Sequence, residues 1–251
     1  MSKLFVALQL YTVRDFTETD VAGTLRKVKA MGYDYVELAG TYGMGFAEFK
    51  ALLDEIGLNA ISAHVQYDDL RANMEETIAS YKSLGCKYVI IPMMQNDVLP
   101  GGKNCSKEFF VQFCYACIQE DVIPAYHNHA HEFERLSSGE FILDKLFADV
   151  PALFAEIDTG WVTAAGLCPE EYIKKYTGRC CVVHLKDNAK NADGKYEDRP
   201  VGKGSQNMAG IINAAVAAGA AGFVAELDRA VGLSSLDAAK ESREYLKSLG
   251  Y

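Results

Sequence analysis

Cys180-Cys-Val-Val-His-Leu-Lys-Asp187 is a short apolar run that ends in ionisable side chains. Three further runs in the second half of the chain end in the same way: Ile123-Pro-Ala-Tyr-His-Asn-His-Ala-His-Glu132, Phe154-Ala-Glu-Ile-Asp158 and Phe223-Val-Ala-Glu-Leu-Asp228. A buried strand that finishes in an ionisable side chain is costly to fold unless that side chain has a partner. Four such runs in succession predict that these side chains are one another's partners, around a shared ion.

Similar runs alternate with helical patterns along the whole chain. They are short, continuous and rich in valine, isoleucine and aromatic residues, as expected of parallel strands covered on both faces. Strands are predicted at Leu4–Leu10, Tyr35–Leu38, Leu58–Val65, Tyr88–Pro92, Val122–His127, Leu153–Asp158, Cys180–Leu185 and Gly222–Leu227. Apolar residues between them recur with helical spacing. The later helices are predicted at Lys107–Gln119, Glu140–Phe147, Pro169–Tyr176, Met208–Ala218 and Ser235–Ser248.

Eight strands alternating with eight helices, at about thirty residues per unit, predict a single (β/α)8 TIM barrel. A doubly wound open sheet would require a glycine-rich phosphate turn after the first strand. This chain has Gln9-Leu-Tyr-Thr-Val-Arg14 at that place. No linker or composition break divides the sequence, so we expect one domain over residues 1–251.

The composition excludes several classes of protein. No apolar stretch approaches the roughly 20 residues needed to cross a bilayer, and the N-terminus lacks the pattern of a signal peptide. We therefore expect a cytoplasmic protein. The net charge of −9 argues against a nucleic-acid partner, which requires a basic face. The seven cysteines show no disulfide framework and are expected to be free thiols.

Catalytic groups in such barrels lie at the carboxyl ends of the strands. Asp158, His184 and Glu226 end three consecutive strands, so they should lie side by side. Two carboxylates and an imidazole without a thiolate suit Mn²⁺, Co²⁺, Zn²⁺ or Mg²⁺. A fourth ligand is expected from the preceding run, where strand alternation puts His127 and His129 on one face. Glu132 follows just past that strand and is the other candidate.

The chain resembles the sugar phosphate isomerase/epimerase proteins of the xylose isomerase-like TIM-barrel superfamily. The resemblance runs essentially end to end, and its motifs fall in order. They are Gln9-Leu-Tyr-Thr-Val-Arg-Asp15, Gly32-Tyr-Asp-Tyr-Val-Glu-Leu38, Tyr126-His-Asn-His-Ala-His-Glu-Phe133, Asp158-Thr-Gly-Trp161, Val183-His-Leu-Lys-Asp187, Val201-Gly-Lys-Gly204 and Ala225-Glu-Leu-Asp228.

The resemblance implies one divalent metal ion, held by Glu, Asp, His and Glu from the last four strands. Asp158, His184 and Glu226 match the last three ligands. The first is placed on Glu132, with His127 or His129 as the alternative. Manganese is the expected ion, and magnesium, cobalt and zinc remain open. Lys203 departs from the pattern, because relatives often carry Val-Gly-Glu-Gly in that loop.

The implied reaction is proton transfer on a ketose or keto-sugar through an enediolate that the metal stabilises. His129 and Glu226 are the candidate pair that moves the proton, and Lys186 would stabilise a developing oxyanion. The residues expected to bind the sugar are Gln9, Glu37, His64, His127 and Trp161, the last by stacking on the ring.

Several alternatives remain open at this point. His64 could instead be a core histidine, and either Glu156 or Asp158 could be an interior ion-pair partner. A dehydratase or keto-glycoside lyase would use the same metal and base. A sugar-binding barrel without catalysis is a further class. The expected partner is a small sugar, with no nucleic acid and no membrane, and a homo-oligomer stays open.

Overall fold

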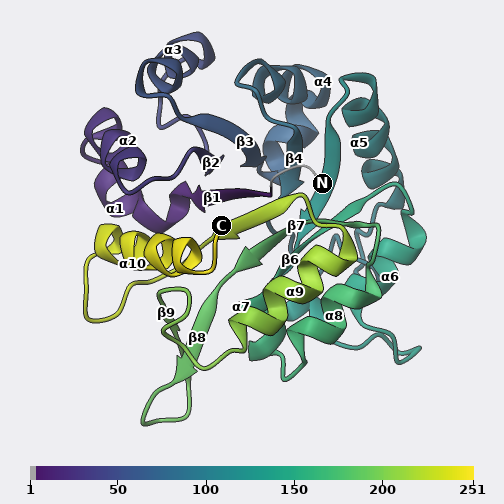
Figure 1. Cartoon of the computed structure of the whole chain (residues 1–251). Coiled ribbons are helices and arrows are strands. Elements are labelled where there is room, and N and C mark those ends of the chain that lie inside the picture. Colours follow the sequence, from purple (N-terminus) through teal and green to yellow (C-terminus); the bar gives the residue numbers. More distant parts are fainter. Residues whose placement is uncertain (1–3) are drawn as a thin grey trace.

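The computed structural model describes residues 4–251, and eight parallel strands in it close into a barrel. Around the barrel the order is β1-β10-β7-β6-β5-β4-β3-β2 (Figure 1). The strands are β1 (Phe5–Gln9), β2 (Tyr35–Leu38), β3 (Asn59–His64), β4 (Tyr88–Ile91), β5 (Ile123–His127), β6 (Phe154–Asp158), β7 (Cys180–Leu185) and β10 (Gly222–Ala225). The predicted (β/α)8 barrel is confirmed.

Helices surround the strands on the outside of the barrel (Figure 1). The longer ones are α2 (Val21–Ala30), α3 (Phe46–Ile56), α4 (Tyr67–Ser83), α5 (Lys107–Gln119), α6 (Ile142–Asp149), α8 (Pro169–Lys175), α9 (Met208–Ala218) and α10 (Ser235–Ser248). Three predicted helices have the expected bounds. The helix predicted from Glu140 begins two residues later, because the Glu140 carbonyl accepts a hydrogen bond from Leu136 N and Phe141 is the N-cap.

Several short elements were not predicted from the sequence. They are the 3₁₀ turns η1 (Leu10–Val13) and η2 (His131–Phe133), the helices α1 (Arg14–Thr17) and α7 (Thr159–Ala164), and the antiparallel hairpin of β8 (Asp187–Lys190) and β9 (Tyr196–Arg199). All of them follow the carboxyl end of a barrel strand. Elements this short carry too few apolar repeats to give a helical or strand period.

The alternation of side chains along the strands decides what enters the barrel. On β10, Val224 packs in the cluster inside the barrel, whereas Phe223 packs between strands and helices. Two residues further on, Glu226 therefore points inward. Ala125 on β5 and Val182 on β7 also belong to the inner cluster, which turns His127 and His184 inward for the same reason.

Two irregularities change this alternation. The pairing of β2 with β3 jumps from Val36↔Ala60 to Glu37↔Ser62, which leaves Ile61 as an extra residue. A similar jump between β6 and β7 leaves Cys181 extra. A β-bulge re-aims the side chains that follow it. On β3 the bulge brings Ser62 and His64 to the barrel interior.

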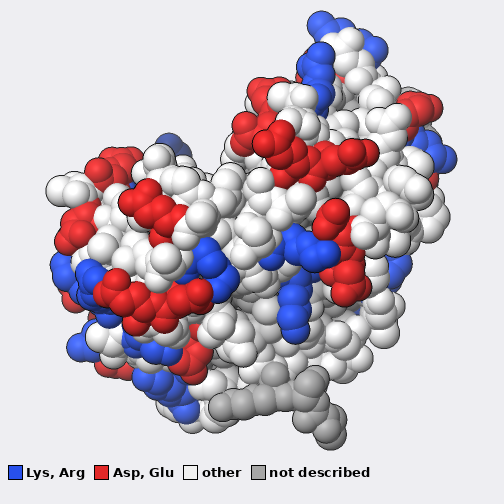
Figure 2. Space-filling model, turned by 90° about the horizontal axis from the view of Figure 1, so that it is seen from above, with Lys and Arg blue, Asp and Glu red and all other residues white. Residues whose placement is uncertain are grey.

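Other properties of the chain agree with the sequence. All seven cysteines are free thiols. Within residues 4–251, no helix is both long enough and apolar enough to span a membrane. The face in Figure 2 carries acidic and basic side chains interspersed, without a continuous basic patch.

Candidate metal centre

Four buried side chains converge at the carboxyl ends of β5, β6, β7 and β10. His127, Asp158, His184 and Glu226 each offer one ligand atom, and these atoms all lie within 4.8 Å of one another. His127 Nε2 lies 3.3 Å from Asp158 Oδ2 and 3.9 Å from Glu226 Oε2, and His184 Nδ1 lies 2.9 Å from Glu226 Oε2. The predicted neighbourhood of Asp158, His184 and Glu226 is thus present, with His127 as its fourth member.

Two atoms of this cluster lack a hydrogen bond. His127 Nε2 and Asp158 Oδ2 are buried, and neither has a hydrogen-bond partner among the residues described. His127 Nδ1 lies 3.1 Å from the carbonyl oxygen of Pro92, which makes Nδ1 the protonated nitrogen and leaves the Nε2 lone pair free. A buried acceptor without a hydrogen bond is costly, and Asp158 Oδ2 forms an ion pair with Lys186 Nζ at 3.0 Å. Two such acceptors 3.3 Å apart, beside another carboxylate and imidazole, fit a divalent cation.

Two carboxylates orient His184 through its Nε2 atom. His184 Nε2 lies 2.6 Å from Glu37 Oε1 and 3.2 Å from Glu156 Oε2, while Nδ1 faces Glu226. Burial lowers the pKa of His184, but the nearby Glu156 and Glu37 carboxylates outweigh burial and raise it well above its usual value. A metal-binding histidine typically donates its other N–H to such a carboxylate. His184 Nδ1 is therefore the nitrogen available to a metal ion.

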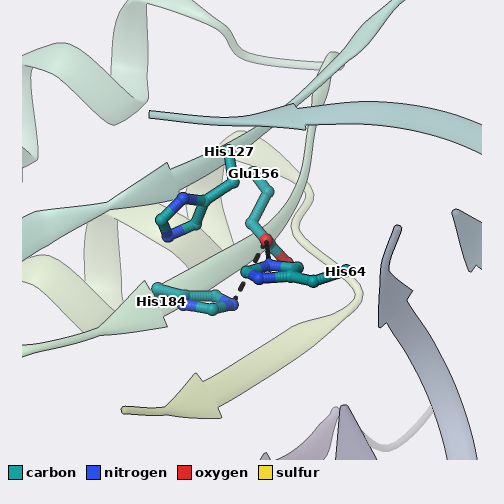
Figure 3. Close-up of side chains that lie close together, drawn as sticks. All are labelled: His64, His127, Glu156 and His184. Carbon is teal, nitrogen blue, oxygen red and sulfur yellow. Dashed lines mark hydrogen bonds and ion pairs between the residues drawn. The ribbon is translucent and has the colours of Figure 1, made fainter. Parts of the chain in front are cut away.

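His64 completes an inner group of imidazoles and carboxylates (Figure 3). Its Nε2 lies 2.7 Å from Glu156 Oε2 and 3.1 Å from Glu37 Oε1, and its ring stacks on His184 with centroids 5.2 Å apart. His64, His127, Glu156 and His184 form a second group with metal-binding geometry. Because His64 and His184 are already paired with the two carboxylates, we interpret this group as support for the outer one.

Lys186 is the cation of the site. Its Nζ lies 3.0 Å from Asp158 Oδ2, 3.1 Å from Glu226 Oε2 and 2.9 Å from Asp228 Oδ2. Burial lowers the pKa of this ammonium, but the three carboxylates raise it well above its usual value. Its stem passes over Gly160, where an added Cβ would come within 2.7 Å of Lys186 Cγ. Lys186 therefore remains charged and balances the carboxylates.

A cavity of about 570 Å³ opens beside the cluster. Its wall includes His64, His127, His129, Trp161 and Glu226, all of which the sequence predicted as site residues. Burial, with the nearby His127 and Lys186, lowers the pKa of His129 to about 3. Its ring is therefore neutral at ordinary pH, and its Nδ1 has no hydrogen-bond partner within the described part of the chain.

Glu132 does not join the four converging side chains. Its Oε1 accepts a hydrogen bond from Tyr126 Oη at 2.7 Å, and its Oε2 accepts one from His129 N at 2.8 Å. Tyr126 alternates with His127 on β5 and packs between the strands and helices. The η2 turn folds Glu132 back onto this outer side, so His127, and not Glu132, converges with Asp158, His184 and Glu226.

Gln9 and Glu37 lie below the cavity. Gln9 Nε2 donates to Glu37 Oε1 at 2.8 Å, and Gln9 Oε1 accepts a hydrogen bond from Tyr11 N. Both side chains are fully buried, and neither is part of the cavity wall. Through Glu37 Oε1 the pair contacts His184 Nε2 at 2.6 Å, and its binding of a sugar stays a prediction.

Six residues that line the cavity were not predicted as site residues: Tyr11, Ala39, Gln66, Pro92, Met93 and Asp228. Asp228 ends an apolar run and a family motif but was given no role, although it stands two residues after Glu226 and alternation could have placed it inward. Tyr11 lies in the short η1 turn and Met93 in a loop, and neither segment shows a period that indicates direction.

The chain matches a known family along most of its length. The family model described as xylose isomerase-like TIM barrel matches residues 25–249. Among solved structures, a sugar phosphate isomerase/epimerase from Parabacteroides distasonis is similar, with 27% identity, 98% of each chain covered and a TM-score of 0.80. Among curated proteins, no significant match is found.

Two further structures share the fold at lower identity. One is a xylose isomerase-like TIM barrel protein from Mycobacterium smegmatis in complex with magnesium, with 18% identity, 99% and 96% of the two chains covered and a TM-score of 0.72. The other is a D-allulose 3-epimerase from Methylomonas sp., with 14% identity, 98% of each chain covered and a TM-score of 0.73. The chain belongs to the xylose isomerase-like TIM-barrel family.

Proposed function

We propose that this protein is a divalent-metal-dependent isomerase or epimerase that acts on a ketose or keto-sugar by proton abstraction. One observation carries the proposal. Four buried ligand atoms from four neighbouring strands meet beside an open cavity, and two of them lack any hydrogen bond. The similarity to a sugar phosphate isomerase/epimerase supports this class of reaction.

The proposed ligands are His127 Nε2, Asp158 Oδ2, His184 Nδ1 and Glu226 Oε2. Two nitrogens and two oxygens suit manganese, which we propose as the ion, with magnesium, cobalt and zinc as alternatives. When bound, such an ion polarises a carbonyl and makes the neighbouring C–H more acidic.

The chain's own residues supply the remaining chemistry. His129 lines the cavity, and its Nδ1 has no hydrogen-bond partner among the described residues, so it is the first candidate to take a proton from a sugar carbon. Glu226 lies on the same wall and is the second candidate for returning it. Trp161 lies 5.2 Å from the His129 ring and provides an apolar face against which a sugar ring can stack. Lys186 holds the Asp158 and Glu226 carboxylates in place.

Metal content tests the ligand set. Protein loaded with manganese and then dialysed should hold one ion per chain, and His127→Ala or Asp158→Ala should lose it. Glu132→Gln is the matched control, because it changes the neighbouring carboxylate that the structure turns away from the site. Loss of metal in Glu132→Gln and its retention in His127→Ala would contradict the ligand set.

Solvent deuterium tests the reaction. Loaded protein in D2O should wash deuterium into the α position of a ketose or 3-keto-sugar, since proton abstraction exposes the carbanion carbon to solvent. Analysis of the products then separates epimerase and isomerase from dehydratase and keto-glycoside lyase, which share this first step. Bound metal without exchange on a broad panel would favour a sugar-binding barrel.

A further inference from the structure

The carboxyl ends of the last two barrel strands are where barrel enzymes commonly bind a phosphate group. The loops after the seventh and eighth strands present backbone N–H groups to the anion there. In this chain these loops follow β7 and β10, and both stand at the rim of the proposed metal centre. If the N–H groups of these loops already donate to other acceptors, they are not available to a phosphate on the substrate.

After β7, the chain's own carboxylate occupies the glycine-rich loop. Asp187 accepts hydrogen bonds from Gly202 N at 3.0 Å, Gly204 N at 2.8 Å and Gln206 N at 3.2 Å. A Cβ on Gly204 would lie 2.1 Å from Asp187 Oδ1, so the backbone is pressed against the carboxylate. The Val201-Gly-Lys-Gly204 loop thus already holds an acidic side chain.

A second carboxylate does the same after β10. Asp198, on the hairpin strand β9, accepts hydrogen bonds through its Oδ2 from Asp228 N at 2.8 Å and Arg229 N at 3.2 Å. They are the first N–H groups after Glu226 that the barrel and its helices leave available, because Leu227 N donates to Thr12 Oγ1. The two loops that would otherwise cradle a phosphate are therefore filled by the chain's own acidic side chains.

Two cations that contact residues of the cavity wall already have partners. Lys186 is paired with three carboxylates at 3.1 Å or less. Arg14 donates to the carbonyl oxygens of Tyr11 and Asp228 at 2.8 and 2.7 Å, with its guanidinium over the Tyr11 ring. The wall itself includes Glu226 and Asp228 but, within residues 4–251, no lysine or arginine.

Two polar atoms near the cavity belong to an indole and an imidazole. Trp161 Nε1 and His129 Nδ1 are both buried and have no hydrogen-bond partner among the described residues. An indole donor and an imidazole suit sugar hydroxyls. A dianionic phosphate would instead meet the carboxylates of Glu226 and Asp228 and, among the described wall residues, no lysine or arginine.

We infer that the site takes an uncharged ketose or keto-sugar and discriminates against the phosphorylated form of the same sugar. The inference rests on the proposed function in that it takes the cavity to be the sugar site. It assigns Asp228 as the residue that determines this specificity, because its carboxylate lies on the cavity wall and also engages Lys186.

Trp161 makes binding measurable without chemistry, since it is the one tryptophan in the chain and lines the cavity. Its fluorescence in manganese-loaded protein would be titrated with matched pairs, such as fructose and fructose 6-phosphate or tagatose and tagatose 6-phosphate. The neutral sugar should bind at least about tenfold more tightly, which is about 1.4 kcal/mol. Equal or tighter binding of the phosphorylated sugar, or no response to any neutral ketose or 3-keto-sugar, would overturn the inference.

One variant and its control test whether Asp228 causes the preference for the neutral over the phosphorylated sugar. Asp228→Asn should narrow the preference for the neutral sugar several-fold, because it removes a carboxylate from the wall and releases one partner of Lys186. Asp193→Asn makes the same charge change on the exposed hairpin turn and should leave the preference unchanged. An unchanged preference in Asp228→Asn would overturn the role assigned to Asp228.

Deuterium exchange on the same pairs separates this inference from the proposed function. Exchange confined to the phosphorylated sugar would support the isomerase proposal and overturn the inference. Tight binding of the neutral sugar without exchange would support the inference and count against the isomerase proposal.

Discussion

Lys186 competes directly with a metal ion for two carboxylates of the proposed site. Its Nζ lies 3.0 Å from Asp158 Oδ2 and 3.1 Å from Glu226 Oε2, two of the proposed ligand atoms. Burial raises the pKa of Asp158, but Lys186 and His127 outweigh burial and hold it below its usual value. A divalent ion held by these two carboxylates shares them with the ammonium. Lys186→Met removes the charge and keeps most of the stem that packs against Gly160.

The variant should bind metal more tightly and be less stable when metal is removed. Two unit charges about 4 Å apart interact by about 4 kcal/mol at an effective dielectric constant of 20. The carboxylates attract Lys186 and the ion alike, so we expect a net gain of at least about 1.4 kcal/mol, or tenfold in Kd. Breaking a buried ion pair from one side costs about 3–5 kcal/mol. At this chain length that corresponds to a fall in Tm of roughly 6–20 °C.

Calorimetric titration of manganese into chelator-treated protein would measure the Kd, and thermal unfolding with and without metal would measure the stability. Lys195→Met, which removes an exposed lysine from the β8–β9 turn, is the matched control and should change neither quantity. An unchanged or weaker Kd in Lys186→Met would refute the reasoning, because it would mean that the ammonium and the metal do not share the carboxylates.

Three other predictions concern the base, a close contact and a remote ion pair. His129→Gln should slow deuterium exchange by about 10²–10⁴-fold with unchanged metal content, and a preserved rate would show that another group takes the proton. Gly160→Ala should destabilise by about 1–3 kcal/mol in urea unfolding, since its Cβ would meet the Lys186 stem, and an unchanged midpoint would contradict that contact. Asp144→Asn should cost about 1–2 kcal/mol in the same assay, because the carboxylate accepts from Tyr172 Oη, Tyr176 Oη and Lys175 Nζ. Burial raises the pKa of Asp144, but these hydrogen bonds outweigh burial and lower it. The difference in unfolding free energy between the wild type and Asp144→Asn should therefore be full above about pH 4 and vanish as the pH falls through the lowered pKa. A difference that does not depend on pH would contradict this account.

Much of the barrel was predictable because strand and helix periods are local. The bounds of β2 and β7 were predicted correctly, as were those of α5, α9 and α10. Each is a continuous apolar run or an amphipathic segment with clear ends. The short elements at the carboxyl ends of the strands were not predictable, because three to six residues cannot show a period.

The site divides in the same way. Asp158, His184 and Glu226 follow from the sequence, since they end consecutive strands and the ends of parallel strands meet at one rim of a barrel. Glu156 was one of two candidates for an interior ion-pair partner, and the structure pairs it with His64 and His184. Which of the two acidic residues on β6 does which task depends on depth within the barrel, a property that no local pattern records.

The sequence by itself determined the fold, three of the four converging side chains and their location at the barrel mouth, because alternation along a strand and the order of strands are properties of the chain. Only the tertiary structure shows that His127, and not Glu132, lies beside these three side chains. That arrangement depends on the η2 turn, which folds Glu132 toward Tyr126 on the outer face of β5 and leaves His127 Nε2 free inside. The pairing of Lys186 with three carboxylates also depends on the tertiary structure, because these carboxylates come from β6 and from the segment after β10. The direction of a side chain in a loop and the competition of charged groups for one partner depend on contacts between segments that are distant in the sequence.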